Sequence, residues 1–204
     1  MQNLNPDIHD IRIYQKLGRV DAKSLESVDQ LLLILPAKPA GTVFGKLPQG
    51  AKMQAVYRKH AAGSTPAFTT RLVNKKQTLV VAGTIAADAS TFEQLTLGRK
   101  LVAAATSQKP GCVGICAVGF DTAAQTSLVK SILAAALAAA FKLPSYKSEP
   151  EPETIKTIRL LGADEKIDTR RTEAEAKGNN LARWLTVQPP NVLDAAGYAH
   201  LIRD

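Results

Sequence analysis

The chain has 204 residues and a mass of 21.8 kDa, and its 26 Lys and Arg against 18 Asp and Glu give a net charge of +8. A globule of this mass buries about 70% of the surface of its extended chain, enough for one domain, or one domain plus a fragment of another. With 45% apolar and 22% charged residues and no short repeat, the composition excludes disordered, collagen-like, mucin-like and coiled-coil proteins.

The first fifty residues carry short apolar segments separated by turn-forming residues. Residues 11–13 alternate apolar and polar side chains and predict a first strand, and residues 24–30 predict a short helix. The continuous apolar run 31–35 predicts a buried central strand. Residues 36–50 contain three Pro and three Gly and therefore predict a loop.

Three further segments predict the rest of a sheet. Residues 52–58 and 68–73 alternate apolar and polar side chains, which is typical of half-buried strands, and residues 78–82 form a second continuous apolar run. The connections between these segments are short, so we expect the sheet to be at least partly antiparallel.

From residue 90 onward, helices alternate with strands. A helix capped by Ser90 or Thr91 is expected to extend to residue 107, followed by a strand over 112–118. The next helix, 122–142, capped by Asp121 or Thr122, is apolar almost all the way round and should pack between layers. An exposed Pro-rich loop over 144–152 and a last strand over 154–161 complete a three-layer α/β domain around a mixed sheet.

The longest apolar run argues against a membrane span, and the two cysteines argue for the reducing cytoplasm. As a helix, residues 132–141 rise only about 15 Å, half the thickness of a bilayer core, so we expect no membrane partner. The amino-terminal residues have no signal-peptide pattern. In an extended segment, Cys112 and Cys116 lie roughly 13 Å apart, too far for a disulfide. They also lack the His or Cys neighbours of a zinc site, which predicts two buried thiols.

The last forty residues predict helices without a domain around them. Residues 172–187 form a helix with Ala174, Gly178 and Ala182 at four-residue spacing, and two prolines stop it. Asp194 then caps a new helix, with Leu193 expected to pack on Tyr198. The apolar stripe of this second helix (Tyr198, Leu201 and Ile202) has no sequence after it that could cover it, so we expect the chain to be a piece of a longer protein.

A family resemblance supports this interpretation. Residues 173–193 read Glu-Ala-Glu-Ala-Lys-Gly-Asn-Asn-Leu-Ala-Arg-Trp-Leu-Thr-Val-Gln-Pro-Pro-Asn-Val-Leu. With its Gly, its Leu-Ala-Arg-x-Leu and its Pro-Pro-Asn, this segment resembles the interdomain region of the leucyl aminopeptidases, hexameric two-metal enzymes of the cytosol. The resemblance implies a macrodomain-like, three-layer α/β/α mixed sheet over 1–165, an interdomain linking helix over 166–190, and the first helix of a truncated catalytic domain over 191–204.

The resemblance also implies what this chain lacks. In the family, carboxylates and a lysine around an Asn-Thr-Asp-Ala-Glu-Gly-Arg stretch of the catalytic domain hold two divalent metals, Zn or Mn, and no such stretch occurs here. The three histidines, His9, His60 and His200, are not at ligand spacing. Asp164-Glu165 and Glu173/Glu175 are expected to be solvated charges. We therefore assign no catalytic, cofactor-binding or metal-binding residue to this chain.

Three features leave a binding function open. Residues 41–46 resemble a P-loop, but the glycine spacing is wrong and Leu47 replaces the required Ser or Thr. Gly111, Gly114 and Gly119 flank a strand that leads into a helix, where a diphosphate could bind, although Phe120 and Asp121 oppose it and packing also explains the glycines. Residues 30–87 hold eight Lys or Arg and no Asp or Glu, a stretch (38–76) that could attract DNA, although aromatic residues are scarce.

These observations lead to one predicted function and one alternative. The chain is expected to be the non-catalytic N-terminal domain of a leucyl-aminopeptidase-like metalloexopeptidase of the cytoplasm. Its partners are then its own catalytic domain, the other subunits of a hexameric parent and the parent's peptide substrates. The alternative is a stand-alone binding module, either DNA-contacting or nucleotide-binding.

Overall fold

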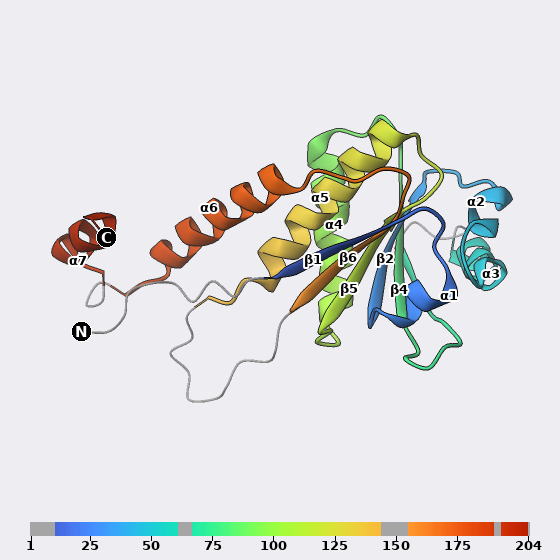
Figure 1. Ribbon diagram of the computed structural model, residues 1–204, viewed down its shortest axis with the longest axis horizontal. Coiled ribbons are helices and arrows are strands. Elements are labelled where there is room, and N and C mark those ends of the chain that lie inside the picture. The colour runs from blue at the N-terminus through green and yellow to red at the C-terminus, as the bar shows by residue number, and fades with distance from the viewer. Residues whose placement is uncertain (1–10, 61–66, 144–154, 190–192, 204) are drawn as a thin grey trace.

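The computed structural model describes residues 11–60, 67–143, 155–189 and 193–203, with side chains as far as residue 199. In these residues a six-stranded sheet has the order β1-β6-β5-β2-β4-β3 (Figure 1). Its strands are β1 (Arg12–Leu17), β2 (Gln30–Pro36), β3 (Ala67–Arg71), β4 (Leu79–Ile85), β5 (Cys112–Ala117) and β6 (Thr157–Ala163). All neighbouring strands are parallel except β3 and β4, which confirms the predicted mixed sheet.

Helices cover both faces of this sheet. In chain order the helices are α1 (Ala22–Glu26), α2 (Gly41–Gly45), α3 (Gly50–His60), α4 (Thr91–Thr106), α5 (Thr122–Ala140), α6 (Arg170–Thr186) and α7 (Ala195–Arg203). One hydrophobic core joins the sheet to α1, α2 and α3, and the other joins it to α4, α5 and α6. The three-layer α/β/α architecture predicted from the sequence is therefore confirmed.

The central strand β2 shows why residues 31–35 are all apolar. Its odd-numbered leucines pack with Phe44 and Met53 of α2 and α3, whereas Leu32 and Ile34 pack with residues of α4 and α5. Because both faces of the strand are buried, apolar side chains are favoured on both, and Gln30, the first residue of β2, is the buried polar exception. The strand lies between β5 and β4, as a central strand should.

The helix α5 is a core helix. It packs against α4 and α6 and against strands β5 and β6, so apolar residues are required around most of its circumference. Among the described helices, it alone is long and apolar enough to span a bilayer, and its packing against the sheet and two helices explains that composition. Its N-cap is Asp121, which accepts the amide of Ala124 at 2.8 Å. The α4 cap is Ser90, with Glu93 completing a capping box.

Two predictions in the first half are wrong. Residues 52–58 belong to the helix α3, not to a strand. Over so few residues, the alternation of Met53, Ala55 and Tyr57 also fits a helix that buries Met53 and half-buries Val56 and Tyr57. The segment 36–50 is not only loop, because α2 forms within it and places Val43 and Phe44 in the core.

Other boundaries differ by smaller amounts. The first helix is α1, and it begins after Asp21, whose carboxylate accepts the amide of Ser24; Gln30 already belongs to β2. The expected strands at 68–73, 78–82, 112–118 and 154–161 correspond to β3, β4, β5 and β6. The expected loop 144–152 lies outside the described residues, as does residue 154.

Candidate functional site

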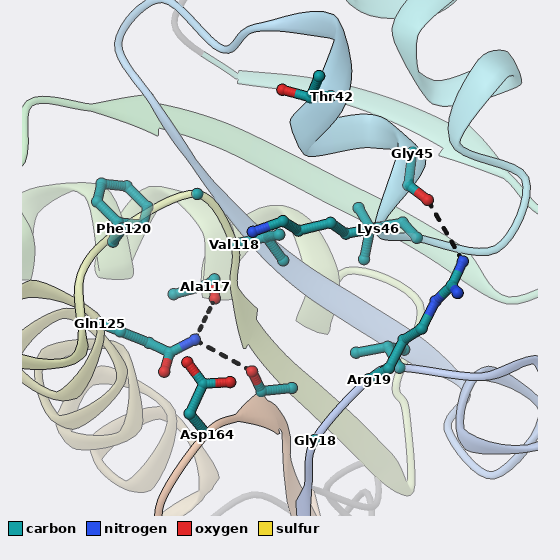
Figure 2. A pocket seen from close by; sticks show the side chains of 14 residues that line it. Gly18, Arg19, Thr42, Gly45, Lys46, Ala117, Val118, Phe120, Gln125 and Asp164 are labelled. Carbon is teal, nitrogen blue, oxygen red and sulfur yellow. Dashed lines mark hydrogen bonds between the residues drawn. The ribbon is translucent and has the colours of Figure 1, made fainter.

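A cleft of about 590 Å³ opens at the carboxyl edge of the sheet, the edge at which the five parallel strands end (Figure 2). Its walls come from the β1–α1 turn, from α2 and the residues after it, from the β5–α5 turn and from the end of β6. After β5 the chain continues to β6 on one side of it in the sheet, whereas after β2 it continues to β3 and β4 on the opposite side, so the direction of the connections reverses between β5 and β2. Ligands of open α/β sheets bind at such a reversal of direction.

Three charged residues line this cleft from separate elements. Arg19 follows β1, Lys46 is the C-cap of α2, and Asp164 follows β6. The guanidinium of Arg19 lies 3.5 Å from the carbonyl oxygen of Gly45, which is a neutral partner. In the described part of the chain, none of the three charges takes part in an ion pair.

A nearby carboxylate, Asp21, already has partners within the fold. Asp21 forms an ion pair with Lys16 at 2.6 Å and accepts hydrogen bonds from the amide and hydroxyl of Ser24 at the start of α1. The Lys16 hydrogen bond and the Ser24 hydrogen bonds together hold the pKa of Asp21 well below its usual range. Asp21 therefore pairs with Lys16 and not with Arg19, which is exposed.

A buried amide fixes the inner wall of the cleft. Gln125 of α5 donates through Nε2 to the carbonyl oxygens of Ala117 at 2.8 Å and Gly162 at 3.1 Å (Figure 2). One side chain thus ties the ends of β5 and β6 to the same helix. This inner wall is a rigid part of the fold, in contrast to the long side chains of Arg19 and Lys46.

Two of the three glycines that suggested a phosphate cradle, Gly114 and Gly119, lie in close packing, whereas a Cβ at Gly111 would have only an ordinary contact, 3.6 Å from Asp29. Gly119 has φ +89°, and a Cβ there would lie 2.9 Å from Val43 of α2. At Gly114, a Cβ would lie 3.1 Å from Leu31 and 3.2 Å from Val28. The positive φ and the close contact require glycine at Gly119, and tight packing favours it at Gly114, whether or not a ligand binds.

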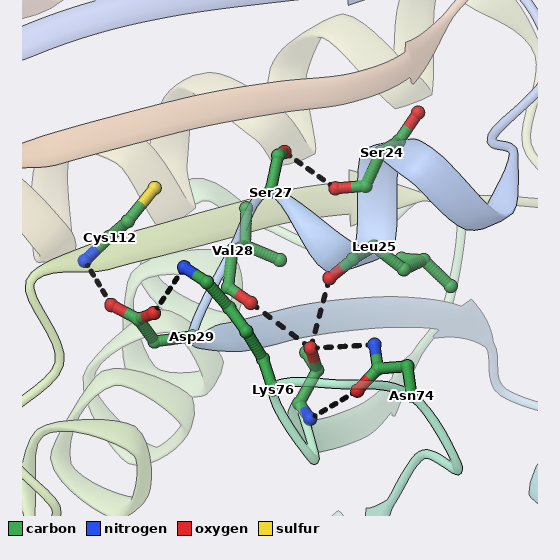
Figure 3. A network of polar contacts seen from close by, with 9 residues as sticks. Ser24, Leu25, Ser27, Val28, Asp29, Asn74, Lys76 and Cys112 are labelled. Carbon is green, nitrogen blue, oxygen red and sulfur yellow. Dashed lines mark hydrogen bonds and ion pairs between the residues drawn. The ribbon is translucent and has the colours of Figure 1, made fainter.

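The opposite, amino edge of the sheet has polar groups that bind one another (Figure 3). Asp29 accepts the amide of Cys112 at 2.8 Å and pairs with Lys76 at 2.7 Å. Its partial burial raises the pKa of this carboxyl, but the hydrogen bonds from Lys76 and Cys112 outweigh burial and lower the pKa overall. The buried hydroxyl of Thr78 lies 2.9 Å from the carbonyl oxygen of Leu25, and it accepts a hydrogen bond from Asn74.

The cysteines lie on the same strand and are both free, as predicted. Cys116 is buried, and burial raises its pKa to about 12. Cys112 is only half-buried, so the prediction of two fully buried thiols holds for one of them. Burial also raises the pKa of Cys112.

The cations of the basic stretch 38–76 lie on the outside of the molecule. All eight of its Lys and Arg side chains are exposed. Several are already used within the fold: Lys76 pairs with Asp29, Lys52 donates to the carbonyl oxygen of Arg71, and Arg71 donates to Gln108. The stretch is thus a solvated surface in which part of the hydrogen-bonding capacity is committed.

The linking helix α6 contacts the domain through one row of buried residues, two of them polar and two apolar. Thr172, Ala176, Asn180 and Trp184 are its buried residues, spaced four apart, and they face α5. The row of small residues that the sequence suggested (Ala174, Gly178 and Ala182) faces outward, and a Cβ at Gly178 would meet no other atom within 4 Å. Of the Pro-Pro-Asn sequence after α6, only Pro189 is described, because residues 190–192 lie outside the described residues.

Arg183, in the Leu-Ala-Arg motif, secures this contact. Its guanidinium donates to the carbonyl oxygen of Ala138 at 2.8 Å, in the last turn of α5, and to Asn180 at 3.1 Å. It also lies over the ring of Phe141, 5.8 Å from the centroid. An arginine at the carboxyl end of a helix interacts favourably with the helix dipole, so Arg183 caps α5.

The last helix, α7, leads away from the sheet at the far end of α6 (Figure 1). Its N-cap is Asp194, as predicted, which accepts the amide of Gly197 at 2.7 Å. Tyr198 is 46% exposed. The side chains of Leu201 and Ile202 lie outside the described residues, so the covering of the predicted apolar stripe is described only at Tyr198.

The described residues contain no group of three or more His, Cys, Asp or Glu that could hold a metal ion. His60 ends α3 and lies against Phe68, with 6.3 Å between ring centroids. His9 and the side chain of His200 fall outside the description. The two metals that the family resemblance implies thus have no ligand set among the residues that the structure describes.

Sequence reasoning missed the three charges of the cleft. It noted Lys46 only in an incomplete P-loop and among the cations of the basic stretch, it treated Asp164 as a solvated turn residue, and it did not single out Arg19. The one available signal was that each residue follows a strand, or lies in the loop after one, at the edge where parallel strands end. The strand order, which the sequence did not give, was needed to bring them together.

Comparisons with known proteins show the fold. No protein-family model matches the chain, and no curated protein matches it in sequence. A mutant leucine aminopeptidase from tomato has a TM-score of 0.70 and 16% identity, over 96% of this chain and 42% of the enzyme. The leucyl aminopeptidases of Trypanosoma cruzi and Trypanosoma brucei match with TM-scores of 0.59 and 0.61, and each is 14% identical over 96% of this chain.

The likeness confirms the resemblance to this family at the level of the fold. The chain is an α/β domain that matches part of a leucine aminopeptidase. It spans about two fifths of the length of the enzymes that it matches: 42%, 41% and 42%.

Proposed function

We propose that this chain is the non-catalytic N-terminal domain of a leucyl-aminopeptidase-like metalloexopeptidase, an enzyme that removes N-terminal residues from peptides. The fold comparison carries this proposal, because nearly the whole chain aligns with less than half of the tomato enzyme. The interdomain motif adds a second, independent observation from the sequence, since Leu181-Ala182-Arg183 lies on a helix that caps the domain's core helix.

The proposed domain boundaries follow the packing of α6. Residues 1–165 form the macrodomain-like body, residues 166–190 the linking helix, and residues 191–204 the first helix of the catalytic domain. Gln15 supports the first boundary: its side-chain amide donates to the carbonyl oxygen of Ile167 at 2.7 Å and accepts the amide of Ile167 at 3.0 Å. This double hydrogen bond holds the start of the linker against the edge strand β1.

The chemistry of the parent enzyme resides in its other domain. Two divalent metals, Zn or Mn, would supply a metal-bound hydroxide and polarise the scissile carbonyl there. The residues described here offer no ligand group for them. The role that we propose for this domain in the cytoplasm is to shape access to that catalytic cavity and to take part in assembly of a hexameric enzyme.

Two activity measurements test this proposal. The purified 204-residue chain should not release chromophore from a leucyl chromogenic substrate, with or without added Mn²⁺ or Zn²⁺. The protein encoded by the complete reading frame should do so in a metal-dependent manner. Chelator-sensitive turnover by the 204-residue chain contradicts the assignment, and so does a complete reading frame without a metal-ligand stretch.

The exposed cations of residues 38–76 favour duplex DNA as the ligand for the alternative function, a stand-alone binding module. All eight are exposed, and the stretch contains no acidic residue to oppose a phosphate backbone. Retention of the chain on duplex DNA that vanishes between about 50 and 200 mM salt indicates only non-specific attraction to phosphate. Sequence-selective retention at the higher salt concentration supports the alternative.

A further inference from the structure

The charged groups of the cleft at the carboxyl edge are separated by sign. The side chain of Lys46 extends over the cleft toward Val118, and Arg19 approaches from the β1–α1 turn (Figure 2). Asp164 lies at the end of β6, the strand that Gln125 holds through the carbonyl of Gly162. The cleft thus offers positive charge on one side and negative charge on the other.

A ligand of a single charge sign fits this arrangement poorly. An anion such as a phosphate would be repelled from the inner wall by Asp164. A simple cation would be repelled by Lys46 and Arg19. A molecule with one positive and one negative group satisfies both sides, because each charge meets an opposite charge that has no ionic partner in the described part of the chain.

Apolar surface lies between the charges. Val20, Leu47, Val118 and Phe120 line the cleft: Val20 is next to Arg19 in the chain, Leu47 is next to Lys46, and Val118 and Phe120 belong to the β5–α5 turn. A volume of about 590 Å³ is within the range of small-molecule sites, and such sites combine an apolar lining with a few placed polar groups. The lining therefore suits aliphatic or aromatic side chains on the ligand.

We infer that the cleft binds a small zwitterion of the peptide class, a short peptide or a free α-amino acid with apolar side chains. Its carboxylate lies toward Lys46 and Arg19, and its ammonium group lies toward Asp164. This inference uses only residues of this chain and does not depend on a catalytic domain. The proposed role is binding alone; the described residues hold no group of three or more His, Cys, Asp or Glu that could bind a metal ion.

Calorimetric titration of the 204-residue chain tests the inference with four probes: L-leucine, leucyl-alanine, N-acetyl-leucyl-alanine amide and pyrophosphate. We expect leucyl-alanine to bind and its doubly blocked form to bind at least about tenfold more weakly, because charge-assisted hydrogen bonds at both ends are lost. Equal affinity for leucine identifies the free amino acid as sufficient, and weaker affinity identifies a peptide. Equal binding of the blocked peptide, binding of pyrophosphate alone, or no heat with any probe at millimolar concentration overturns the inference.

Matched substitutions locate the binding. Lys46→Gln and Asp164→Asn should each weaken leucyl-alanine about tenfold. The controls Lys38→Gln and Asp88→Asn change exposed residues outside the cleft and should leave affinity unchanged. In Asp164→Asn, acetylation of the amino group should no longer matter, which a purely structural effect of the substitution does not produce. Unchanged affinity in both cleft variants overturns the inference.

Discussion

Polar side chains at the two edges of the sheet differ in whether they have partners within the fold. At the amino edge, Asp29, Lys76 and the buried Thr78 bind one another or nearby backbone groups (Figure 3). At the carboxyl edge, Arg19, Lys46 and Asp164 surround an open cleft and form no ion pairs within the described residues (Figure 2). Since the same strands end at both edges, the difference lies in the connecting segments.

The comparison distinguishes polar groups that are hydrogen-bonded within the fold from charged groups that can bind a ligand. A buried polar group that has its hydrogen bonds stabilises the fold, and its removal leaves its partners unsatisfied. A charged group at the mouth of a cleft contributes little to stability and keeps its hydrogen-bonding capacity for a ligand. Substitutions of these polar side chains should therefore differ in what they change: stability for Asp29 and Thr78 at the amino edge, and binding for Arg19, Lys46 and Asp164 at the carboxyl edge.

The largest expected effect on the free energy of unfolding comes from the backbone of the carboxyl edge, at Gly119. Gly119→Ala should lower the free energy of unfolding by about 3 kcal/mol, because φ is +89° and the new Cβ meets Val43 at 2.9 Å. Urea unfolding measures it. The control Gly178→Ala lies on an exposed helical surface with open space, and it should instead raise stability by about 0.5–1 kcal/mol. Equal stability of Gly119→Ala and the unsubstituted protein contradicts the packing role.

Removal of one hydroxyl at the amino edge should come next in size. Thr78→Val leaves the carbonyl oxygens of Leu25 and Val28 and the amide of Asn74 without this buried partner, at a cost of about 2 kcal/mol. The same change at Thr69, which is exposed on β3, should stay within about 0.5 kcal/mol. A loss of peptide binding in Thr78→Val without a loss of stability breaks the proposed division between the edges.

The ionic contact of Asp29 should show in the pH dependence of stability. Its pKa is lower in the folded protein than in the unfolded chain, so its stabilisation is complete above the unfolded value and is lost as the pH falls through the folded value. Asp29→Asn should be less stable by about 1 kcal/mol at pH 7, a modest amount because the carboxylate is 36% exposed and screened by solvent. The difference from the unsubstituted protein should shrink below about pH 4. A difference that is constant from pH 7 to strongly acidic conditions contradicts the role of ionisation.

The smallest expected effect on stability is at the charges of the cleft. Arg19→Gln and Lys46→Gln should leave the midpoint of urea unfolding unchanged, because neither cation has an ionic partner within the described residues. The same variants are expected to weaken peptide binding. A marked loss of stability in either variant shows that the charge is structural, and it removes the contrast between the two edges.

The elements with strong local signals were predicted correctly. The strand β2 followed from an unbroken apolar run, and α4 and α5 followed from their caps at Ser90 and Asp121. The error at α3 has a local cause as well: the alternation from Met53 to Tyr57 is too short to distinguish a period of 2 from one of 3.6. The inward row of α6 was also missed, because small residues at Ala174 and Gly178 resemble a contact face as much as the true row does.

By itself, the sequence determined the three-layer class, most helix and strand positions, and the likeness to the leucyl aminopeptidases through the motif before Pro189. These depend on residues close together in the chain. Only the tertiary structure brought Arg19, Lys46 and Asp164 around one cleft and placed Arg183 on the end of α5. Such contacts depend on which strands are neighbours, and strand order is set by the packing of distant segments, which no local period or cap encodes.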